Sequence, residues 1–202
     1  DTTFWGRDIY GKGRLSFLIE EILKKTKIPW IRILYTHPLH IDKSLLRLME
    51  REDRLCRYID LPLQHVDDKI LRLMGRGITK RQIIDLLQKI RDTVKEVFVR
   101  TTFIVGFPGE TEREFDSLIQ FIRDYPFERL GCFIYSREEN TRAYNFRDQV
   151  HYRTKRYRFN TLMSIQREIS ASLLTRLVGK RLKVLIERKE SSSFVGRTCL
   201  LY

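Results

Sequence analysis

The chain has 202 residues, 42% of them hydrophobic, which is enough for one substantial core or for one domain and the start of another, and excludes overall disorder. Its 39 Lys and Arg against 26 Asp and Glu give a net charge of +13, which favours polyanions such as RNA but equally fits a solvated basic surface. No stretch approaches the roughly 20 apolar residues of a membrane span, and residues 1–20 lack a secretory-signal pattern. We therefore expect a soluble cytoplasmic protein with no membrane partner.

Apolar residues at helical spacing alternate with short β-branched and aromatic runs through most of the chain. The spacing predicts helices at 15–25, 41–51, 79–94 and about 112–124, and a short helix opened by Asp67 or Asp68. The runs predict strands at 30–36, 56–63, 97–107 and 129–135, while the first residues read as the end of a strand. This alternation predicts an α/β fold with parallel strands and right-handed crossovers.

Near-continuous apolar strands fit a sheet that is covered on both faces, in a barrel or a doubly wound fold. In both architectures ligands bind at the carboxyl ends of the strands. The candidate functional loops are therefore 1–6, 36–40, 62–67, 105–111 and 135–141.

The pattern changes near Tyr152, where a long helix begins that we expect to end near Gly179. Two strands are predicted after it, at 181–188 and 194–202, around a turn at Ser191 to Ser193. Two strands alone do not make a stable sheet, so they indicate the opening of a small β domain. The predicted division is residues 1–150, a connecting helix at 151–179, and residues 180–202.

The three cysteines, Cys56, Cys132 and Cys199, are far apart and form no C-x-x-C pair. Neither a disulfide framework nor a self-contained zinc or iron–sulfur site follows from them, and we predict no metal ligand in this chain.

The stretch from residue 101 to 116, TTFIVGFPGETEREFD, combines an apolar strand with a tight turn. Thr111 and Glu114 form a capping box, so a helix starts directly after Gly109. The glycines allow the backbone to approach a ligand closely, although a tight turn without a ligand explains them equally well. The turn lacks the Lys and Ser/Thr pair of a phosphate-binding P-loop, which disfavours nucleotide triphosphate hydrolysis.

Two further polar positions lie on strands. Gln64 follows a strand end, where its amide can donate and accept hydrogen bonds, or serve only as a loop cap. Arg100 interrupts an apolar strand, so we expect its guanidinium to meet a carboxylate from the protein or from a ligand. Glu138 and Glu139 are a candidate carboxylate pair, but consecutive acidic residues in a loop are more often solvated.

Five segments in this order resemble the radical S-adenosylmethionine methylthiotransferases: DTTFWGRDIYG, YIDLPLQHVDDKILRLMGRG, RTTFIVGFPGETEREFDSL, FERLGCFIYSREENTRAYN and MSIQREISASLLTRLVGK. The sequence of the second segment is more similar to the branch of the family that modifies an aspartate of ribosomal protein S-twelve than to the branch that modifies isopentenyl-adenosine in tRNA. The resemblance implies an open six-stranded (β/α) barrel, present here in part, followed by the start of a small β domain of the TRAM type.

The resemblance also implies the residues that bind S-adenosylmethionine. Those expected to hold its methionyl and ribose groups are Asp1, Thr2, Thr3, Gln64 and Arg100, of which Arg100 would meet the methionyl carboxylate. Those expected along its adenine are Ile104, Val105, Gly106 and Tyr135, with Glu110 closing the strand-five motif. No residue of the chain is an obvious catalytic acid or base.

The intact family member is implied to use two 4Fe-4S clusters, reductive cleavage of S-adenosylmethionine and transfer of a methylthio group to carbon. The cysteine motif for these clusters is absent here, so we expect a fragment that is inactive alone. Asn140 stands where the branch commonly has Gly. The implied partners are ribosomal protein S-twelve or the small ribosomal subunit, RNA, and an electron donor such as flavodoxin. A basic RNA-binding module without catalysis is the alternative.

Overall fold

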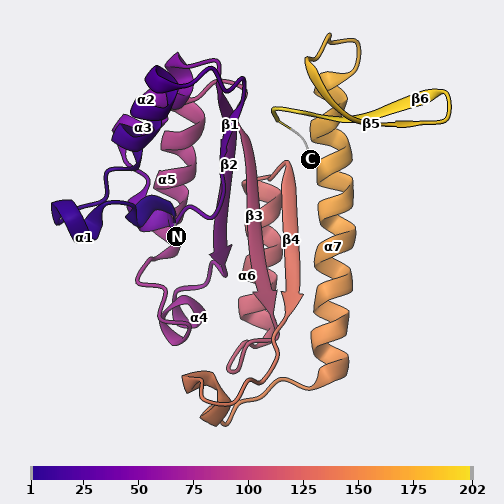
Figure 1. Ribbon diagram of the computed structural model, residues 1–202. Helices are drawn as coiled ribbons and strands as arrows, with labels where there is room; N and C mark the ends of the chain where they lie inside the picture. Colours follow the sequence, from indigo (N-terminus) through magenta and orange to yellow (C-terminus); the bar gives the residue numbers. More distant parts are fainter. Residues whose placement is uncertain (1, 201–202) are drawn as a thin grey trace.

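Four parallel strands form the central sheet of the computed structural model, which describes residues 2–200. They are β1 (Ile31–Ile33), β2 (Leu55–Gln64), β3 (Phe98–Val105) and β4 (Arg129–Ile134), adjacent in chain order (Figure 1). The predicted parallel α/β arrangement is confirmed. The predicted extent of the first strand is wrong, because the backbone turns into the left-handed region at Tyr35, where φ is 57°.

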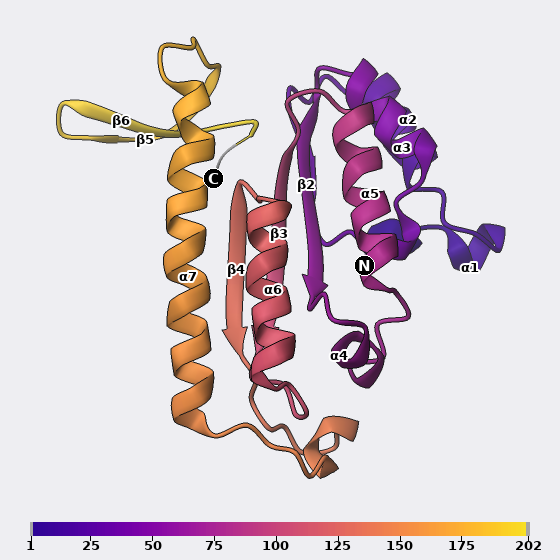
Figure 2. The ribbon, with the colours of Figure 1, turned by 180° about the vertical axis from the view of Figure 1, so that it is seen from behind.

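Helices cover one face of this sheet, as the two opposite views show (Figures 1 and 2). They are α2 (Leu15–Lys25), α3 (Lys43–Arg51), α5 (Lys80–Thr93) and α6 (Glu112–Asp124). The shorter segments are η1 (Thr2–Phe4), α1 (Arg7–Tyr10), η2 (Pro38–His40), α4 (Asp68–Leu73) and η3 (Arg142–Asn145). Residues 2–4 are thus a 3₁₀ turn and not the end of a strand. Asp67 caps α4 by accepting a hydrogen bond from the Lys69 N–H at 2.9 Å, as predicted.

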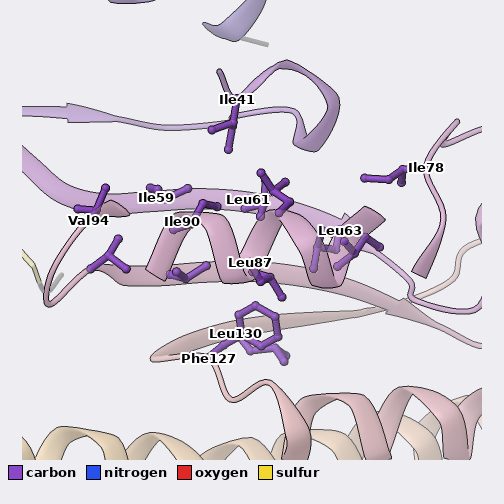
Figure 3. Close-up of a cluster of buried hydrophobic side chains, with 14 of the residues drawn as sticks. Ile41, Ile59, Leu61, Leu63, Ile78, Leu87, Ile90, Val94, Phe127 and Leu130 are labelled. Atoms are coloured by element: carbon purple, nitrogen blue, oxygen red, sulfur yellow. The ribbon is translucent and has the colours of Figure 1, made fainter. Parts of the chain in front are cut away.

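The hydrophobic core lies between the sheet and this helical layer (Figure 3). Alternate residues of β2, namely Ile59, Leu61 and Leu63, point into it and meet Leu87 and Ile90 of α5. All five side chains are buried. Each contributes on the order of 1.5–3 kcal/mol of burial free energy, so the core fixes which face of each strand points away from the helices.

The opposite face of the sheet carries the other alternate residues, and among residues 2–200 no helix crosses it (Figure 1). Asp60 and Arg100 are partners in the β2–β3 register, and Ile104 pairs with Phe133 of β4. Phe133 is 62% exposed. The expected cover on both faces is present only in part in residues 2–200. At the amino-terminal ends of β2 and β3, Tyr58 and Phe98 are buried against a cluster that includes Leu174, Leu177 and Leu200, whereas polar residues alternate with apolar ones further along these strands.

The last part of the chain contains α7 (Tyr152–Leu174), η4 (Thr175–Leu177) and a hairpin of β5 (Val184–Glu190) and β6 (Ser193–Thr198). Helix α7 runs along β4 and contacts α6. The predicted long helix is confirmed but ends five residues before Gly179. A two-residue turn at Ser191 and Ser192 joins the antiparallel strands, as the serine-rich stretch predicts. Their identity as a TRAM domain stays a prediction.

No helix within residues 2–200 has the length and apolar composition needed to cross a bilayer.

Candidate functional site

The carboxyl ends of the strands meet at one edge of the sheet, where two residues other than glycine have left-handed backbones. Tyr35 follows β1 with φ 57°, and Gln64 ends β2 with φ 72°. Such conformations cost on the order of 1–3 kcal/mol each and persist only where the surroundings fix them. Backbone strain at two adjacent strand ends marks this edge as the candidate site.

Asp60 ties the first three strands together beneath this edge. Its carboxylate is 1% exposed and accepts hydrogen bonds from the Tyr35 N–H and from Arg100 Nη1, both at 3.2 Å. Its backbone carbonyl accepts a hydrogen bond from the Thr36 hydroxyl at 2.6 Å. The prediction that Arg100 meets a carboxylate is confirmed, and the carboxylate belongs to the protein. The predicted contact of Arg100 with a cofactor carboxylate stays a prediction.

The turn after β3 is built around the buried carboxylate of Glu110. The Gly106 N–H donates to Glu110 Oε2 at 2.9 Å, and Arg158 Nη1 of α7 donates to Glu110 Oε1 at 2.8 Å. Arg158 also donates to the Glu110 carbonyl at 3.0 Å. A hydrogen bond from a backbone amide and a buried ion pair together hold the turn, so its shape depends on a residue almost fifty positions later.

His65 completes this buried group. Its Nδ1 accepts a hydrogen bond from the Asp67 N–H at 3.0 Å, which assigns the ring proton to Nε2 in the neutral imidazole. Nε2 lies 3.6 Å from Glu110 Oε2, and His65 is completely buried. The carboxylate of Glu110 thus faces a guanidinium on one side and an imidazole N–H on the other.

Lys155 of α7 fills the space beside Gly106. A Cβ added to Gly106, where φ is 72°, would clash with Lys155 Cγ. Lys155 Nζ donates to the Tyr135 carbonyl at 3.0 Å and lies 4.8 Å from the centroid of the Tyr135 ring. Burial lowers the pKa of Lys155, and the nearby Glu110 charge opposes this shift. The close approach that Gly106 permits is therefore to α7, and its predicted contact with adenine stays a prediction.

Helix α6 begins as the capping box predicts. The Glu114 carboxylate accepts hydrogen bonds from the Thr111 hydroxyl and from the Thr111 N–H, the latter at 2.8 Å. Burial alone would raise the pKa of Glu114, but the bonds from Thr111 and Arg113 lower it to about 2. The turn from Gly106 to Thr111 is thus fixed at both ends by buried carboxylates.

Two neighbouring cavities lie at this edge, with Gln64 and Arg76 in the walls of both. One, of about 410 Å³, is also lined by Ile104 and Phe107, and the other, of about 250 Å³, by His37. The pKa of His37 is lowered to about 4, mainly because the ring is partly buried and secondly because Arg76 carries a positive charge nearby. Sequence reasoning missed Arg76; its signal is the flanking pair of glycines at 75 and 77.

The structure brings only some of the predicted cofactor residues together. Gln64 and Ile104 line the larger cavity, whereas the Val105 side chain is buried in the core behind the sheet. The Tyr135 ring packs edge-on against Phe107, with a centroid distance of 5.1 Å.

At the amino-terminal end, the Thr2 hydroxyl donates to the Leu34 carbonyl at 2.8 Å, next to the β1 end. Thr3 is buried and lines a separate cavity of about 400 Å³ near α2. Asp1 lies outside the described residues.

No cluster of His, Cys, Asp or Glu suited to a metal ion occurs within residues 2–200. Cys56 is buried, Cys132 and Cys199 are half-buried, and all three are free thiols. Burial, with a smaller contribution from Glu110, raises the pKa of Cys132 to about 12, so this thiol is a poor metal ligand. These residues do not fit an iron–sulfur cluster.

The fold agrees with comparison to known proteins. Residues 5–122, more than half of the chain, match the Radical SAM superfamily, and the chain belongs to this superfamily.

The chain is also similar over nearly its whole length to curated ribosomal protein uS12 methylthiotransferases named RimO. It is 44% identical over 198 residues to that of Christiangramia forsetii and 42% identical over 200 residues to that of Alkaliphilus oremlandii. These alignments cover 98% of this chain but only 44% and 46% of the two relatives. The chain thus spans about half the length of the curated relatives it matches.

Two solved structures share the fold at low sequence identity. Coproporphyrinogen III oxidase HemN from Escherichia coli, described as a radical SAM enzyme, aligns with a TM-score of 0.58 and 17% identity, covering 80% of this chain and 36% of HemN. The methyltransferase TsrM from Kitasatospora setae aligns with a TM-score of 0.52 and 16% identity, covering 66% of this chain and 24% of TsrM. The radical SAM fold class predicted from the sequence is confirmed.

Proposed function

We propose that this chain is part of a radical S-adenosylmethionine methylthiotransferase that modifies an aspartate of ribosomal protein uS12. The observation that carries the proposal is the 42–44% identity to uS12 methylthiotransferases over 98% of the chain. A tRNA isopentenyl-adenosine methylthiotransferase is the second candidate, because the chain carries a net charge of +13 and tRNA is a polyanion.

S-adenosylmethionine, when bound together with a reduced iron–sulfur cluster, supplies radical chemistry at an otherwise unreactive carbon. We infer that two 4Fe-4S clusters serve the whole protein and that their ligands lie outside residues 2–200. The cavities walled by Gln64, Ile104 and Arg76 fit the polar cofactor, since they combine an amide, a cation and apolar surface at the strand ends.

The chain's own residues position the cofactor. Gln64, held in a left-handed conformation, offers its amide to hydroxyl or carboxylate groups. Ile104 and Phe107 offer apolar surface for a purine, and the Glu110 network keeps the adjacent turn rigid. Phe107 lines the larger cavity and packs against the Tyr135 ring, whereas the Val105 side chain is buried in the core, so its role toward the adenine would fall to its backbone.

The remaining assignments complete the proposal. The partners are ribosomal protein uS12 or the small ribosomal subunit, with an electron donor such as flavodoxin. The cytoplasm is the compartment where these partners occur. The β5–β6 hairpin is the start of a TRAM-like domain, and residues 151–179 connect it to the barrel.

The decisive experiment uses the chain expressed with all residues that flank it in its gene, reconstituted anaerobically with iron and sulfide. The protein is given S-adenosylmethionine and reductant with uS12 in one reaction and with unmodified tRNA in another, and both substrates are analysed by mass spectrometry. Methylthiolation of uS12 is expected. Modification of tRNA alone would overturn the choice of substrate, and a flanking sequence without a C-x-x-x-C-x-x-C motif would overturn the enzyme assignment.

An additional RNA contact is favoured by the outer side of α7. Tyr152, Arg153, Arg156 and Tyr157 are exposed, with Arg156 5.9 Å from the Tyr152 ring centroid. No acidic residue occurs in residues 149–167, so this side combines cations with aromatic rings, as RNA-binding surfaces do.

The RNA contact predicts a specific salt dependence. In the double variant R153E/R156E, binding to ribosomal RNA should weaken, and the slope of log affinity against log salt should fall by about one per lost phosphate contact. The control K24E changes an exposed cation on α2 that is paired with Glu21. Equal effects of the two changes would contradict a specific contact at α7.

A further inference from the structure

Charged side chains form a row across the middle of the sheet, on the face opposite the helical layer. Asp60 of β2 is the register partner of Arg100 in β3, and Arg100 is the register partner of Arg129 in β4. All three residues line one cavity. Because neighbouring strands lie only about 4.8 Å apart, the two guanidinium groups repel each other, and a single carboxylate does not balance both charges. The row therefore carries an excess of positive charge.

The carboxylate of this row is already engaged. Asp60 is 1% exposed and accepts hydrogen bonds from the Tyr35 N–H and from Arg100 Nη1, both at 3.2 Å. The Arg129 side chain, in contrast, takes part in no hydrogen bond, ion pair or ring contact within residues 2–200. Since Arg129 lies next to a second arginine and has no counter-charge, an added anion would stabilise this place.

The cavity over this row is separate from the two cavities at the strand ends. It has a volume of about 440 Å³ and shares only Tyr35 with them. Apart from the charged row, its wall consists of Gly131 and of aromatic and aliphatic side chains. Such surroundings weaken dielectric screening, so the charge of Arg129 acts more strongly here than on an open surface.

Thr102 adds a hydroxyl group to the same place. Its side chain is 8% exposed, and its hydroxyl makes no hydrogen bond within residues 2–200. Thr102 is the register partner of Gly131 in β4. A Cβ added to Gly131 would lie 3.7 Å from Thr102 Oγ1 and 4.0 Å from Arg100 Nη2, so the glycine leaves open a space that both donors border. A buried hydroxyl without a partner and a guanidinium that face one space can both donate to an oxygen of a ligand.

This space lies a short way below the strand ends. Thr102 precedes Ile104, which lines the larger strand-end cavity, by two residues, or roughly 6.6 Å along a strand. A group bound beside Thr102 would therefore adjoin a ligand at the strand ends without occupying the same cavity. Two neighbouring cavities of this kind suit a cofactor and a substrate.

We propose that Arg129, together with Arg100 and Thr102, binds a carboxylate, and that this carboxylate is the side chain of the substrate aspartate. The inference rests on the proposed function, which places S-adenosylmethionine at the strand ends and an aspartate beside it. One carboxylate offsets the excess charge, and its two oxygens can accept from both guanidinium groups and from the hydroxyl. Arg129 is then a specificity-determining residue that selects aspartate over asparagine, and the free side of Arg100 serves the substrate and not the cofactor.

The first arm of the test measures substrate binding without turnover. The full-length protein, saturated with S-adenosylmethionine and kept without reductant, is titrated by calorimetry with a uS12 loop peptide and with the same peptide carrying asparagine. The wild type should prefer the aspartate peptide by about 10-fold to 100-fold, and R129M should lose most of this preference. R129K should keep part of it, because it retains the charge but not the planar fork. T102V should lower it by roughly 2-fold to 10-fold.

The matched control is R123M, which removes an exposed arginine near the end of α6, on the helical layer. It should leave the preference for the aspartate peptide unchanged. The affinity for S-adenosylmethionine should stay unchanged in all variants, because the carboxylate site is separate from the strand-end cavities. A loss of cofactor affinity in R129M as large as its loss of peptide preference would overturn the proposal. If R129M melts at a lower temperature than the wild type, R129K and T102V replace it, and unchanged preferences in both overturn the proposal equally.

The second arm needs no peptide. The melting temperature is followed while acetate replaces chloride at constant ionic strength, and it should rise in the wild type but not in R129M, because a ligand that binds only the folded state stabilises it. If neither peptide binds but acetate stabilises the wild type through Arg129, the proposed uS12 substrate fails while the carboxylate site stands. If R129M keeps the peptide preference and acetate has no effect that depends on Arg129, the inference is overturned.

Discussion

Replacing Arg158 with Met tests how strongly α7 holds the turn after β3. The change removes the guanidinium that donates to Glu110 Oε1 at 2.8 Å and to the Glu110 carbonyl at 3.0 Å. The Glu110 side chain is completely buried, and it would keep only the Gly106 N–H at 2.9 Å and the His65 ring 3.6 Å away. Removing one partner of a buried pair costs about 3–5 kcal/mol, and the remaining hydrogen bond places R158M near the lower end.

A loss of about 3 kcal/mol corresponds to a fall in melting temperature of roughly 6–12 °C for a protein of this size. The assay is urea unfolding followed by circular dichroism at neutral pH, which gives the free energy of unfolding and the m-value. R156M is the matched control, because Arg156 is exposed on the same helix and lies 5.9 Å from the Tyr152 ring centroid. Its expected change is within about 0.5 kcal/mol.

The double variant E110Q/R158M separates a buried-charge penalty from loss of packing. Without the carboxylate no unpaired charge remains, so the double variant should be more stable than R158M alone. The reasoning is refuted if R158M destabilises the protein no more than R156M. It is also refuted if E110Q lowers the free energy of unfolding of R158M by as much as it lowers that of the wild type.

Three other outcomes follow from single positions. G106A should cost about 1–3 kcal/mol in urea unfolding, because φ is 72° and the new Cβ meets Lys155, and K155A should recover part of that loss. The NMR titration of His37 should give a pKa of about 4, and R76M should move this pKa toward the usual value of about 6.5. The unfolded chain therefore binds the proton of His37 more tightly than the folded chain. As the pH falls from about 6.5 to about 4, the free energy of unfolding should decrease. N140G should be neutral or stabilising and N140A destabilising by about 1 kcal/mol, because φ at Asn140 is 63°.

Local chemistry and periodicity were sufficient to predict the parallel α/β arrangement, whereas the radical SAM fold class came from the resemblance of five segments to a known family. The strand at 97–107, the capping box at Thr111 and the cap at Asp67 depend on neighbours within a few residues, and the structure contains all three. The expectation of strand 30–36 failed because Tyr35 leaves the strand to donate its N–H to Asp60, twenty-five residues later. Periodicity carries no information about such a long-range bond.

The candidate site was predicted less completely for the same reason. Arg100 was recognised because a charge inside an apolar strand is conspicuous, but the identity of its partner depends on the β2–β3 register. Arg76 lies in a polar, glycine-flanked stretch where an arginine attracts no notice. Its place at the site appears only when the end of α4 is folded back against Pro62, where Arg76 Nη2 donates to the Pro62 carbonyl and the side chain lines both cavities.

Helix α7 belongs energetically to the sheet, because it packs along β4 and its polar contacts hold the residues that flank both ends of this strand. Near its start, Lys155 and Arg158 hold the turn after β3 and the end of β4. Near its end, Gln166 Nε2 donates to the Phe127 carbonyl at 2.8 Å and the Ser170 hydroxyl donates to the Glu128 carbonyl at 2.6 Å. Within residues 2–200 β4 is an edge strand, and α7 covers it much as a further strand would, but with side chains as donors. Because Leu162 of α7 is buried in the core and Arg158 bonds to Glu110, a displacement of α7 would disturb both the core and the Glu110 network.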